Sequence, residues 1–364
     1  MHHHDPTLWR PSASLEVLQL RAKVLAHVRQ FFHERGYWAV ETPVLSHDVV
    51  VDAHLEPFRT RGSDEAATQS GAVHPSADEL FLQTSPEFGM KRLLAAGATS
   101  IYQITRAFRK EELGRLHNPE FTMIEWYRVG DTHQEQMDFV EELVESVYQF
   151  VGRARDEARE SSKHDRYRAL LAAAPPAPAR PFSRRTYDAA FEMSVGRRVL
   201  ELSAPQLAEL ARAVGIVPPP SQEADDRDGW LNLILAEVVE PTLGYERPAF
   251  VYDYPASQAA LARIRPEEPP VAERFELYIA GIEICNGYHE LTDPDELRRR
   301  MEVQAALRAR ENRPRLPREN RLLAAMEAGL PPCAGVALGF DRLFLLAIGG
   351  ASLADVIAFP FGRA

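Results

Sequence analysis

The sequence predicts an α+β fold in which an antiparallel sheet is flanked by helices. Strand-like runs come in consecutive pairs, Ile101 to Phe108 with Phe121 to Arg128, and Phe275 to Ile279 with Ile282 to Asn286. Helical patterns are grouped between these pairs, and no regular strand–helix–strand alternation is found. Hairpins build antiparallel sheets, whereas a doubly wound parallel sheet needs a crossover helix between strands.

The first predicted element is a helix from Ser14 to Gly36. Apolar side chains recur there every three or four residues, the spacing of one helix face, at Leu18, Ala22, Leu25, Val28 and Phe32. Glycine readily adopts the left-handed conformation that ends a helix, so Gly36 is predicted to be the stop.

The two hairpins differ in their connections. The first is closed by a long, charged segment from Arg109 to Glu120 that ends in Asn118-Pro119, and the second by the short turn Ala280-Gly281. The other predicted elements, in chain order, are an extended segment at Val40 to Leu45 with Pro43 at an edge or bend, a surface loop at 63–78, helices at Ser85 to Ala96 and Gln134 to Phe150, a helix opened by a capping box at Ser203 and Gln206 and ending at Gly215, a helix at Asp228 to Glu240 stopped by Pro241, and a glycine-then-helix segment between Ala337 and Ile348.

Residues 152–185 are predicted to form a surface insertion. The helical pattern gives way there to charges and then to the run APPAPARP, which favours a stiff, solvated segment. No internal repeat and no second boundary is visible, so we expect a tail over residues 1–13 followed by a single catalytic-size domain over residues 14–364.

Composition excludes several classes of protein. With 45% apolar residues among 364, the chain can bury a core. Its two cysteines, Cys285 and Cys333, are too few for a disulfide framework or a four-thiolate zinc site. No uninterrupted apolar run is long enough to span a membrane, and no signal-peptide pattern opens the chain. We therefore expect a cytoplasmic protein without a membrane partner.

Common catalytic motifs are missing. The chain contains no G-x-x-x-x-G-K-[ST] phosphate loop, no H-E-x-x-H, no C-x-x-C and no G-x-S-x-G. Any nucleotide must therefore be bound by another device.

The first hairpin offers such a device. Arg109 closes one strand, Glu111 opens the connection and Phe121 lies on the returning strand. A strand-held arginine can grip a phosphate in a two-pronged hydrogen bond, a carboxylate can accept from an adenine amine, and an aromatic ring can stack on the base. For Arg109 alone, a surface ion pair is a better explanation than a phosphate contact. A surface ion pair does not explain the hairpin segment as a whole.

Two further strings carry polar residues in apolar surroundings. In GVALGFDRLFLLAIG, Gly339 allows close approach of a ligand to the backbone, and Arg342 lies in the first turn of an apolar helix. In the second hairpin, Glu276 and Glu283 lie on different strands and can face one cavity, which suits Mg²⁺ shared with phosphates. A snorkelling arginine and a solvated strand face are the simpler alternatives.

Together these strings resemble the three signature motifs of class II aminoacyl-tRNA synthetases, in the lysine branch. Phe31 to Leu45 resembles motif 1, Arg109 to Tyr127 motif 2 and Gly335 to Ile348 motif 3, within a likeness that runs from Ser14 to Ala364. The resemblance implies a six- or seven-stranded antiparallel sheet, ATP bent around Mg²⁺, and a homodimer formed through motif 1.

The resemblance also assigns roles to residues. It implies that Arg109 holds the α-phosphate of ATP and that Arg342 lies against the adenine opposite Phe121, with Arg109, Glu111 and Arg342 as the catalytic groups. The other implied residues are Lys110, Glu111, Asn118, Glu283, Ile284 and Gly339 for ATP, Glu276 and Glu283 for Mg²⁺, and Ser85, Pro86, Glu87, Tyr127, Asn286, Glu290 and Ala337 for the amino-acid substrate.

Two departures from lysyl-tRNA synthetases refine the expectation. About a dozen residues precede the first helix where those enzymes carry an anticodon-binding barrel, and Ala337 replaces a glycine. Both features are similar to the stand-alone paralogues that activate (R)-β-lysine and attach it to a lysine of elongation factor P. We therefore expect an ATP-dependent, AMP-forming ligase whose acceptor is elongation factor P and not tRNA.

Two alternatives stay open. A lysyl-tRNA synthetase core could use the basic strip between Arg298 and Arg321, which holds nine arginines against three glutamates. A non-catalytic amino-acid sensor could be built on the same fold, but such a protein would be expected to lose Arg109, Arg342, Glu276 or Glu283.

Overall fold

The computed structural model describes residues 9–50, 55–61, 79–161, 165–317 and 320–364. In this part of the chain, the main feature is a nine-stranded sheet with the order β1-β5-β6-β12-β11-β10-β8-β7, and β9 pairs with β10. All pairs from β5 through β8 are antiparallel, whereas the outer strands β1 and β7 are parallel to their neighbours. The predicted antiparallel α+β architecture is confirmed.

The elements follow in this chain order: α1 (Leu15–Glu34), β1 (Trp38–Ala39), β2 (Leu45–Ser46), β3 (Arg59–Arg61), β4 (Glu79–Leu82), α3 (Glu87–Ala95), β5 (Ser100–Phe108), β6 (Glu120–Val129), α4 (His133–Ser161), α5 (Asp165–Ala172), β7 (Ser183–Thr186), α6 (Tyr187–Val195), α7 (Ala204–Ala213), α8 (Arg227–Ile234), a π-helical turn (Leu235–Val239), β8 (Ala249–Pro255), β9 (Ile264–Arg265), β10 (Val271–Ile279), β11 (Ile282–His289), α9 (Pro294–Arg310), α10 (Arg321–Gly329), β12 (Cys333–Gly339) and α11 (Phe340–Ala347). Short 3-10 turns at Glu240–Thr242, Ala256–Gln258, Leu353–Asp355 and Phe361–Arg363 complete them.

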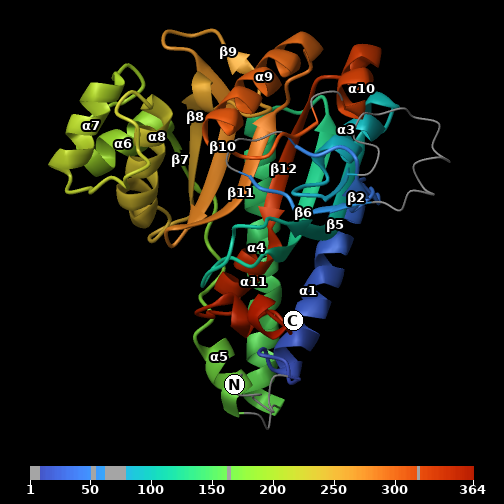
Figure 1. Ribbon diagram of the computed structural model, residues 1–364. Coiled ribbons are helices and arrows are strands. Elements are labelled where there is room, and N and C mark those ends of the chain that lie inside the picture. Colours follow the sequence, from blue (N-terminus) through green and yellow to red (C-terminus); the bar gives the residue numbers. More distant parts are fainter. Residues whose placement is uncertain (1–8, 51–54, 62–78, 162–164, 318–319) are drawn as a thin grey trace, which may run out of the picture.

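One face of the sheet packs against α1, α4 and α11, which extend below the strands in Figure 1. Apolar side chains from these helices and from the strand residues that point toward them form the largest hydrophobic cluster. Its centre holds Phe32, Trp126 and Phe139, whose rings lie 5.3–5.6 Å apart. This packing buries one face of the central strands and leaves the other for α3, α9 and α10 to border.

A separate helical group adjoins the β7–β8 edge of the sheet, at the left of Figure 1. Helices α6, α7 and α8 bury their own apolar cluster, which includes Tyr187, Phe191 and Trp230, against β8 and β10. Near the opposite edge, β2, β4 and β3 form a small three-stranded sheet.

Several predicted elements are confirmed. The first helix begins after Ser14, whose hydroxyl accepts from the Val17 N–H at 3.3 Å, and Gly36 follows it with a φ of 78°. Both hairpins form, and Ala280 and Gly281 have the positive φ values that a tight two-residue turn needs. The capping box at Ser203 and Gln206 is also present.

The face of the first helix was predicted wrongly in part. The buried residues are Val17, Leu20, Val24, Val28, Phe31 and Phe32, while Ala22 is exposed. Leu18 and Leu25 are only half-buried at the flank of the core. The periodicity therefore predicted the helix correctly. The face that packs against α4 is rotated slightly from the predicted apolar face.

Residues 152–185 match the expected irregular, solvated segment only in part. α4 continues to Ser161, and Val151, Ala154 and Ala158 extend its apolar stripe onto the core. α5 then follows, and Ser183–Thr186 joins the sheet as β7. The proline run at 174–181 is irregular and mostly exposed, as predicted, although Ala174 and Phe182 at its two ends are buried.

Other differences are local. Residues 40–44 lie between β1 and β2 and are not strand themselves, although the Val40 N–H donates to the Tyr102 carbonyl oxygen and the Val44 carbonyl oxygen accepts from the Gln83 N–H. α8 changes to a π-helical turn before Pro241, and β8 and β12 were not recognised as strands. The loop predicted at 63–78 lies outside the described residues. Among the helices that the structure describes, none is long and apolar enough to cross a membrane.

Candidate active site

The strand register places the polar residues of the central strands on one face of the sheet. Residues directly opposite one another in neighbouring strands point to the same face, and successive residues alternate. One such row is Gln103, Glu125, Ala337, Asn286 and Glu276, and the row two residues away is Ile101, Tyr127, Gly335, Tyr288 and Arg274. The row next to the first one, on the side away from the second, is Ile104, Ile124, Leu338, Cys285, Leu277 and Phe250, and it packs into the core on the other face.

A buried charge cluster lies at one end of these rows. Lys91, on α3, places its Nζ 2.5 Å from Glu87 Oε1 and 2.6 Å from Glu290 Oε2. All three residues are buried. Burial alone would lower the pKa of the Lys91 ammonium, but the carboxylates of Glu290 and Glu87 raise it. Burial raises the pKa of the Glu290 carboxyl, and Lys91 offsets this in part.

Glu125 adds a third carboxylate to the cluster. It is 1% exposed and accepts hydrogen bonds from the Ser85 hydroxyl and the Tyr127 hydroxyl, each at 2.7 Å. Desolvation and the nearby Glu87 charge raise the pKa of Glu125 to about 7. Ser85 also accepts from the Glu87 N–H at 3.0 Å, so the Ser85 hydroxyl contacts both Glu125 and the backbone of Glu87. Three carboxylates thus face one lysine.

Gly335 and Ala337 shape the floor of this pocket on β12. A Cβ at Gly335 would lie 2.2 Å from the Tyr127 ring and 2.8 Å from Glu290 Oε1, so only glycine leaves room for that ring. Ala337 is the register partner of both Asn286 and Glu125, and its methyl therefore lies between these two side chains on the pocket face.

Glu276 is the centre of a hydrogen-bond network. Its Oε2 accepts from the hydroxyls of Tyr254 and Tyr278, and its Oε1 accepts from Arg274 Nη2 and Asn286 Nδ2. A carboxylate has about four lone-pair sites, and all of them are used here. Glu276 would therefore have to give up one of these hydrogen bonds to bind Mg²⁺.

Glu283 is more available. Its side chain is 40% exposed, and Oε2 lies 3.5 Å from Arg342 Nη1. Desolvation and the Glu276 carboxylate raise its pKa, while Arg342 and Arg109 oppose this shift. The two predicted magnesium ligands are thus close enough to interact electrostatically. Since Mg²⁺ can use one carboxylate with phosphate oxygens and water, Glu283 fits that role by itself.

Arg342 joins motif 3 to the connection of the first hairpin. Its guanidinium donates to the carbonyl oxygens of Leu116 at 3.2 Å and Glu283 at 3.1 Å, and it contacts His117 Nε2. Gly339 leaves open space beside it, since a Cβ there would approach the Ile284 carbonyl oxygen only to 3.7 Å. Arg342, Glu283, Ile284 and Gly339 are brought together as the sequence predicted.

Arg109 lies on the same face but differently from the expectation. Its guanidinium is 5.2 Å from the centre of the Phe121 ring and donates to Glu112 at 3.1 Å. The resemblance placed adenine between Phe121 and Arg342, yet Arg109 covers that ring here. A base stacked on Phe121 would displace Arg109, whose buried Nε has no hydrogen-bond partner in this arrangement.

Three residues predicted for ATP have other partners in this structure. Lys110 is exposed, and its N–H donates to the Glu56 carbonyl oxygen. Glu111 accepts from Arg313 at 3.2 Å. Asn118 donates to the Glu120 carbonyl oxygen and accepts from the Phe361 N–H, which attaches the C-terminal segment to the hairpin. Contact of these residues with ATP stays a prediction.

Sequence reasoning missed several residues of the site. Glu125 and Lys91 both had a recognisable signal, because Glu125 is two residues before Tyr127 on a strand and Lys91 is four residues after Glu87 on a helix. Glu240, next to Tyr278, and Arg274 had none, since their proximity depends on how distant segments meet. Burial and the Glu276 charge raise the pKa of Glu240 to about 7.

Comparison with known proteins shows the family of the chain. The family model of tRNA synthetases class II (D, K and N) matches residues 7–363. A protein of Vibrio vulnificus named elongation factor P–(R)-beta-lysine ligase is 43% identical over 353 residues, 97% of this chain and 98% of the relative. Proteins of the same name from Vibrio cholerae and Klebsiella pneumoniae are 44% and 42% identical and cover 98% and 99% of both chains. The chain therefore belongs to the class II tRNA synthetase family of the D, K and N type, among relatives named elongation factor P–(R)-β-lysine ligases.

Proposed function

We propose that this protein activates (R)-β-lysine with ATP as an aminoacyl adenylate and transfers it to a lysine side chain of elongation factor P. The observation that carries the proposal is the surplus of buried carboxylates at Glu87, Glu125 and Glu290, which only Lys91 balances. A substrate with two amino groups supplies the missing positive charge. The names of the full-length relatives support β-lysine as the diamine and elongation factor P as the acceptor.

The pocket also orients the substrate for reaction. With its amines among the carboxylates, the substrate directs its own carboxylate along the sheet face toward Arg342 and Arg109. The substrate carboxylate attacks the α-phosphorus of ATP in line, and pyrophosphate leaves. The two guanidinium groups stabilise the charge on the phosphoryl oxygens, so that catalysis rests on positioning and electrostatics.

Mg²⁺ would add to this stabilisation by neutralising phosphate charge, and it would be held by Glu283 and, after exchange of a hydrogen bond, by Glu276. In the second step, the ε-amine of the acceptor lysine attacks the carbonyl carbon of the adenylate. An amide bond forms and AMP leaves, and the chain needs no nucleophile of its own.

The proposal includes a cytoplasmic homodimer formed through residues 31–45. This segment exposes Trp38, Val44 and Leu45, which are large apolar side chains at the edge of the sheet. Apolar surface concentrated in one segment is typical of a surface that a second subunit covers.

Two alternatives have weaker support. For tRNA charging, much of the basic strip is neutralised within the chain: Arg298 pairs with Glu327, Arg299 and Arg300 pair with Glu296, and Arg308 is buried against Glu56. Fewer of its arginines can therefore release counterions from a phosphate backbone. For a non-catalytic sensor, Arg109, Arg342 and Glu283 would have no reason to converge.

Transfer of radiolabelled (R)-β-lysine or α-lysine tests the proposal. The protein is incubated with ATP, Mg²⁺, each amino acid, and either purified elongation factor P or lysine tRNA. Label on elongation factor P, faster with β-lysine, is the expected result. Label on tRNA would mean that tRNA is the acceptor and elongation factor P is not. ATP–pyrophosphate exchange without transfer would support the activation step and exclude both acceptors.

A further inference from the structure

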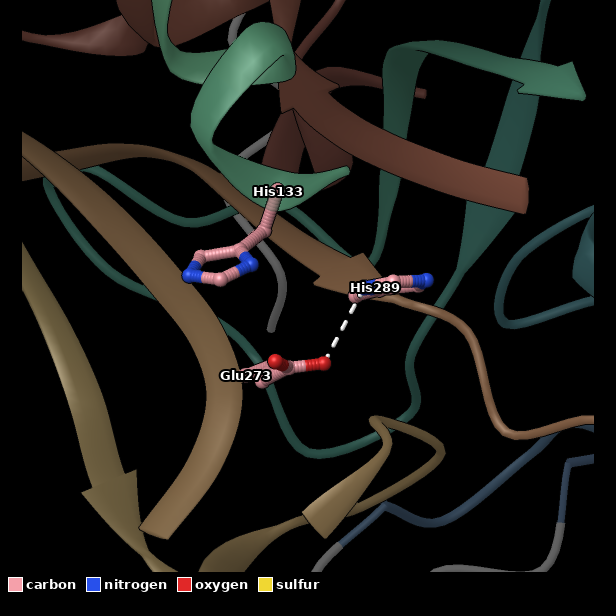
Figure 2. A group of neighbouring side chains, drawn as sticks. All are labelled: His133, Glu273 and His289. Carbon is pink, nitrogen blue, oxygen red and sulfur yellow. Dashed lines mark ion pairs between the residues drawn. The ribbon is translucent and has the colours of Figure 1, made fainter. Parts of the chain in front are cut away.

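A second polar cluster lies on the opposite face of the sheet, behind the substrate pocket. His133 at the start of α4, Glu273 on β10 and His289 on β11 converge there, as Figure 2 shows. One ligand atom of each residue lies within 4.8 Å of the others, and His289 Nδ1 is 3.0 Å from Glu273 Oε2. We propose that these three side chains bind a divalent transition-metal ion, and that zinc is the ion their chemistry favours.

The donor set matches zinc. Two imidazoles and one carboxylate are a common set of protein ligands for this ion, and water completes the tetrahedron. Bonds of about 2.1 Å to one tetrahedral ion place its ligand atoms about 3.4 Å apart, so movements of about an ångström would close this site on the metal.

His133 provides the independent observation. Its side chain is buried, with 3% of the residue exposed, and Nε2 contacts the Gln134 amide at 3.1 Å. Its Nδ1 is buried and has no hydrogen-bond partner among the residues that the structure describes. A buried ring nitrogen left unpaired costs free energy, and a metal ion is one partner that removes the cost.

The groups around the cluster orient its carboxylate. The charges that act on the two histidines are the carboxylates of Glu273 and Glu135 and the guanidinium groups of Arg263 and Arg265, which balance. Arg263 donates to both oxygens of Glu273, at 2.5 and 2.9 Å, which orients the carboxylate from outside as partners of metal ligands commonly do. The Arg263 side chain is 54% exposed and marks the solvent side of the cluster.

The position gives the ion a structural role. His289 immediately precedes Glu290, which points to the substrate pocket on the other face. A metal ion held by His133, Glu273 and His289 would fix the end of β11 to β10 and to the first turn of α4. It would thereby hold Glu290 from behind, independently of the proposed ligase chemistry.

Zinc binding to the full chain tests this inference. Because His2, His3 and His4 could bind metal by themselves, the measurements use a His2→Ala/His3→Ala/His4→Ala variant as the reference. Zinc affinity and stoichiometry are measured by competition with a chromophoric chelator, and Co²⁺ is added separately to record its visible absorption. We expect one equivalent of zinc and the intense Co²⁺ bands of a low-coordinate site.

Single substitutions locate the ion. In the reference background, His133→Gln and His289→Gln should each weaken zinc binding by at least about 100-fold, the upper end of what loss of an outer-shell partner costs. His27→Gln, a half-buried histidine that contacts Ser146 elsewhere, should bind zinc like the reference. If either cluster variant does not fold by circular dichroism, Glu273→Gln takes its place.

Thermal unfolding gives a second readout, since zinc that binds only the folded protein raises its Tm. The reference should be stabilised by zinc and His133→Gln should not. Zinc stoichiometry near zero in the reference, or zinc binding unchanged in His133→Gln, would overturn the assignment and identify the cluster as a buried ion-pair network only.

Discussion

Arg109 is the residue on which adenylate formation depends most directly in the proposed mechanism. Replacing it with alanine removes a guanidinium that would stabilise phosphoryl charge, so ATP–pyrophosphate exchange should fall by about 10²–10³-fold or more. Circular dichroism should show an unchanged fold, because in the described part of the chain the Arg109 guanidinium pairs with Glu112 and contacts the half-buried Phe121 ring. Arg115→Ala, on the same connection but bonded outward to Ala351, is the control. Near-normal ATP–pyrophosphate exchange in Arg109→Ala would contradict the proposed contact between Arg109 and the α-phosphate.

Glu125 should make stability depend on pH. Its pKa is raised from 4.5 to about 7, so the folded chain keeps this proton at pH values where the unfolded chain has lost it. The stabilising contribution of the bound proton is present in acid and is lost as pH rises toward 7. Glu125→Gln has no such proton. As pH rises, its free energy of unfolding should therefore increase relative to that of the wild type, by up to about 3 kcal/mol.

Urea unfolding at several pH values between 4.5 and 8 measures this difference. Glu237→Gln, an exposed position on the π-helical turn, serves as the control and should follow the wild type at every pH. Parallel curves for Glu125→Gln and the wild type would mean that Glu125 titrates normally in the folded protein.

Ala337 should contribute to the choice of amino acid. Its methyl lies between Asn286 and Glu125, and one methyl in a pocket can discriminate by about 10–200-fold. Ala337→Gly should therefore raise kcat/KM for α-lysine relative to β-lysine, by about 10-fold or more. Ala334→Gly, on the same strand but on the other face, controls for loosening of β12. An unchanged ratio would exclude the methyl from specificity.

At the scale of elements, Asp341 connects three segments. Its carboxylate accepts from the Thr122 N–H on β6 at 2.8 Å and pairs with Arg21 on α1 at 2.6 Å, while Asp341 itself lies in the first turn of α11. Both side chains are mostly buried, so Asp341→Asn leaves Arg21 with an uncompensated charge. The free energy of unfolding should fall by about 3–5 kcal/mol.

Chemical denaturation of Asp341→Asn checks this expectation. The control is Glu192→Gln, which breaks an ion pair with the exposed Arg198 and should change the unfolding midpoint little. If the two variants unfold at the same denaturant concentration, the Arg21–Asp341 pair does not hold α1 and α11 to the sheet.

The elements also show where sequence signals are strong. The two hairpins were predicted because alternation and a tight turn act over neighbouring residues, as at Ala280 and Gly281. Residues 152–161 were missed because Gly152 and the following charges weaken the local helical pattern. The contact of Ala154 and Ala158 with the core stabilises this part of the helix. The local sequence does not predict that contact.

For the whole molecule, the proposed dimer predicts a concentration-dependent mass. Trp38 is 56% exposed on the edge strand β1, beside Val44 and Leu45. Trp38→Glu would place a charge in the proposed interface and should convert a dimer into a monomer in sedimentation analysis. Val217→Glu, at an apolar and more exposed position far along the chain, should leave the mass unchanged. A monomeric wild type would refute the dimer.

Sequence alone determined the class of fold and the chemistry of the main groups. The hairpins, the first helix and the residue types at Glu87, Arg109, Glu283 and Arg342 are properties of short stretches, and short-range periodicity and motif spacing report them directly. The structure confirms the antiparallel sheet and brings Glu283 to Arg342 across motif boundaries.

Only the tertiary structure decided which charges are paired and which are in surplus. Lys91 neutralises part of the pocket, Glu276 is already occupied by four donors, and Arg109 covers Phe121. His133 meets Glu273 and His289 although more than a hundred residues separate them in sequence. These contacts join strands and helices distant in the chain, and their energies depend on burial, which the order of residues does not state.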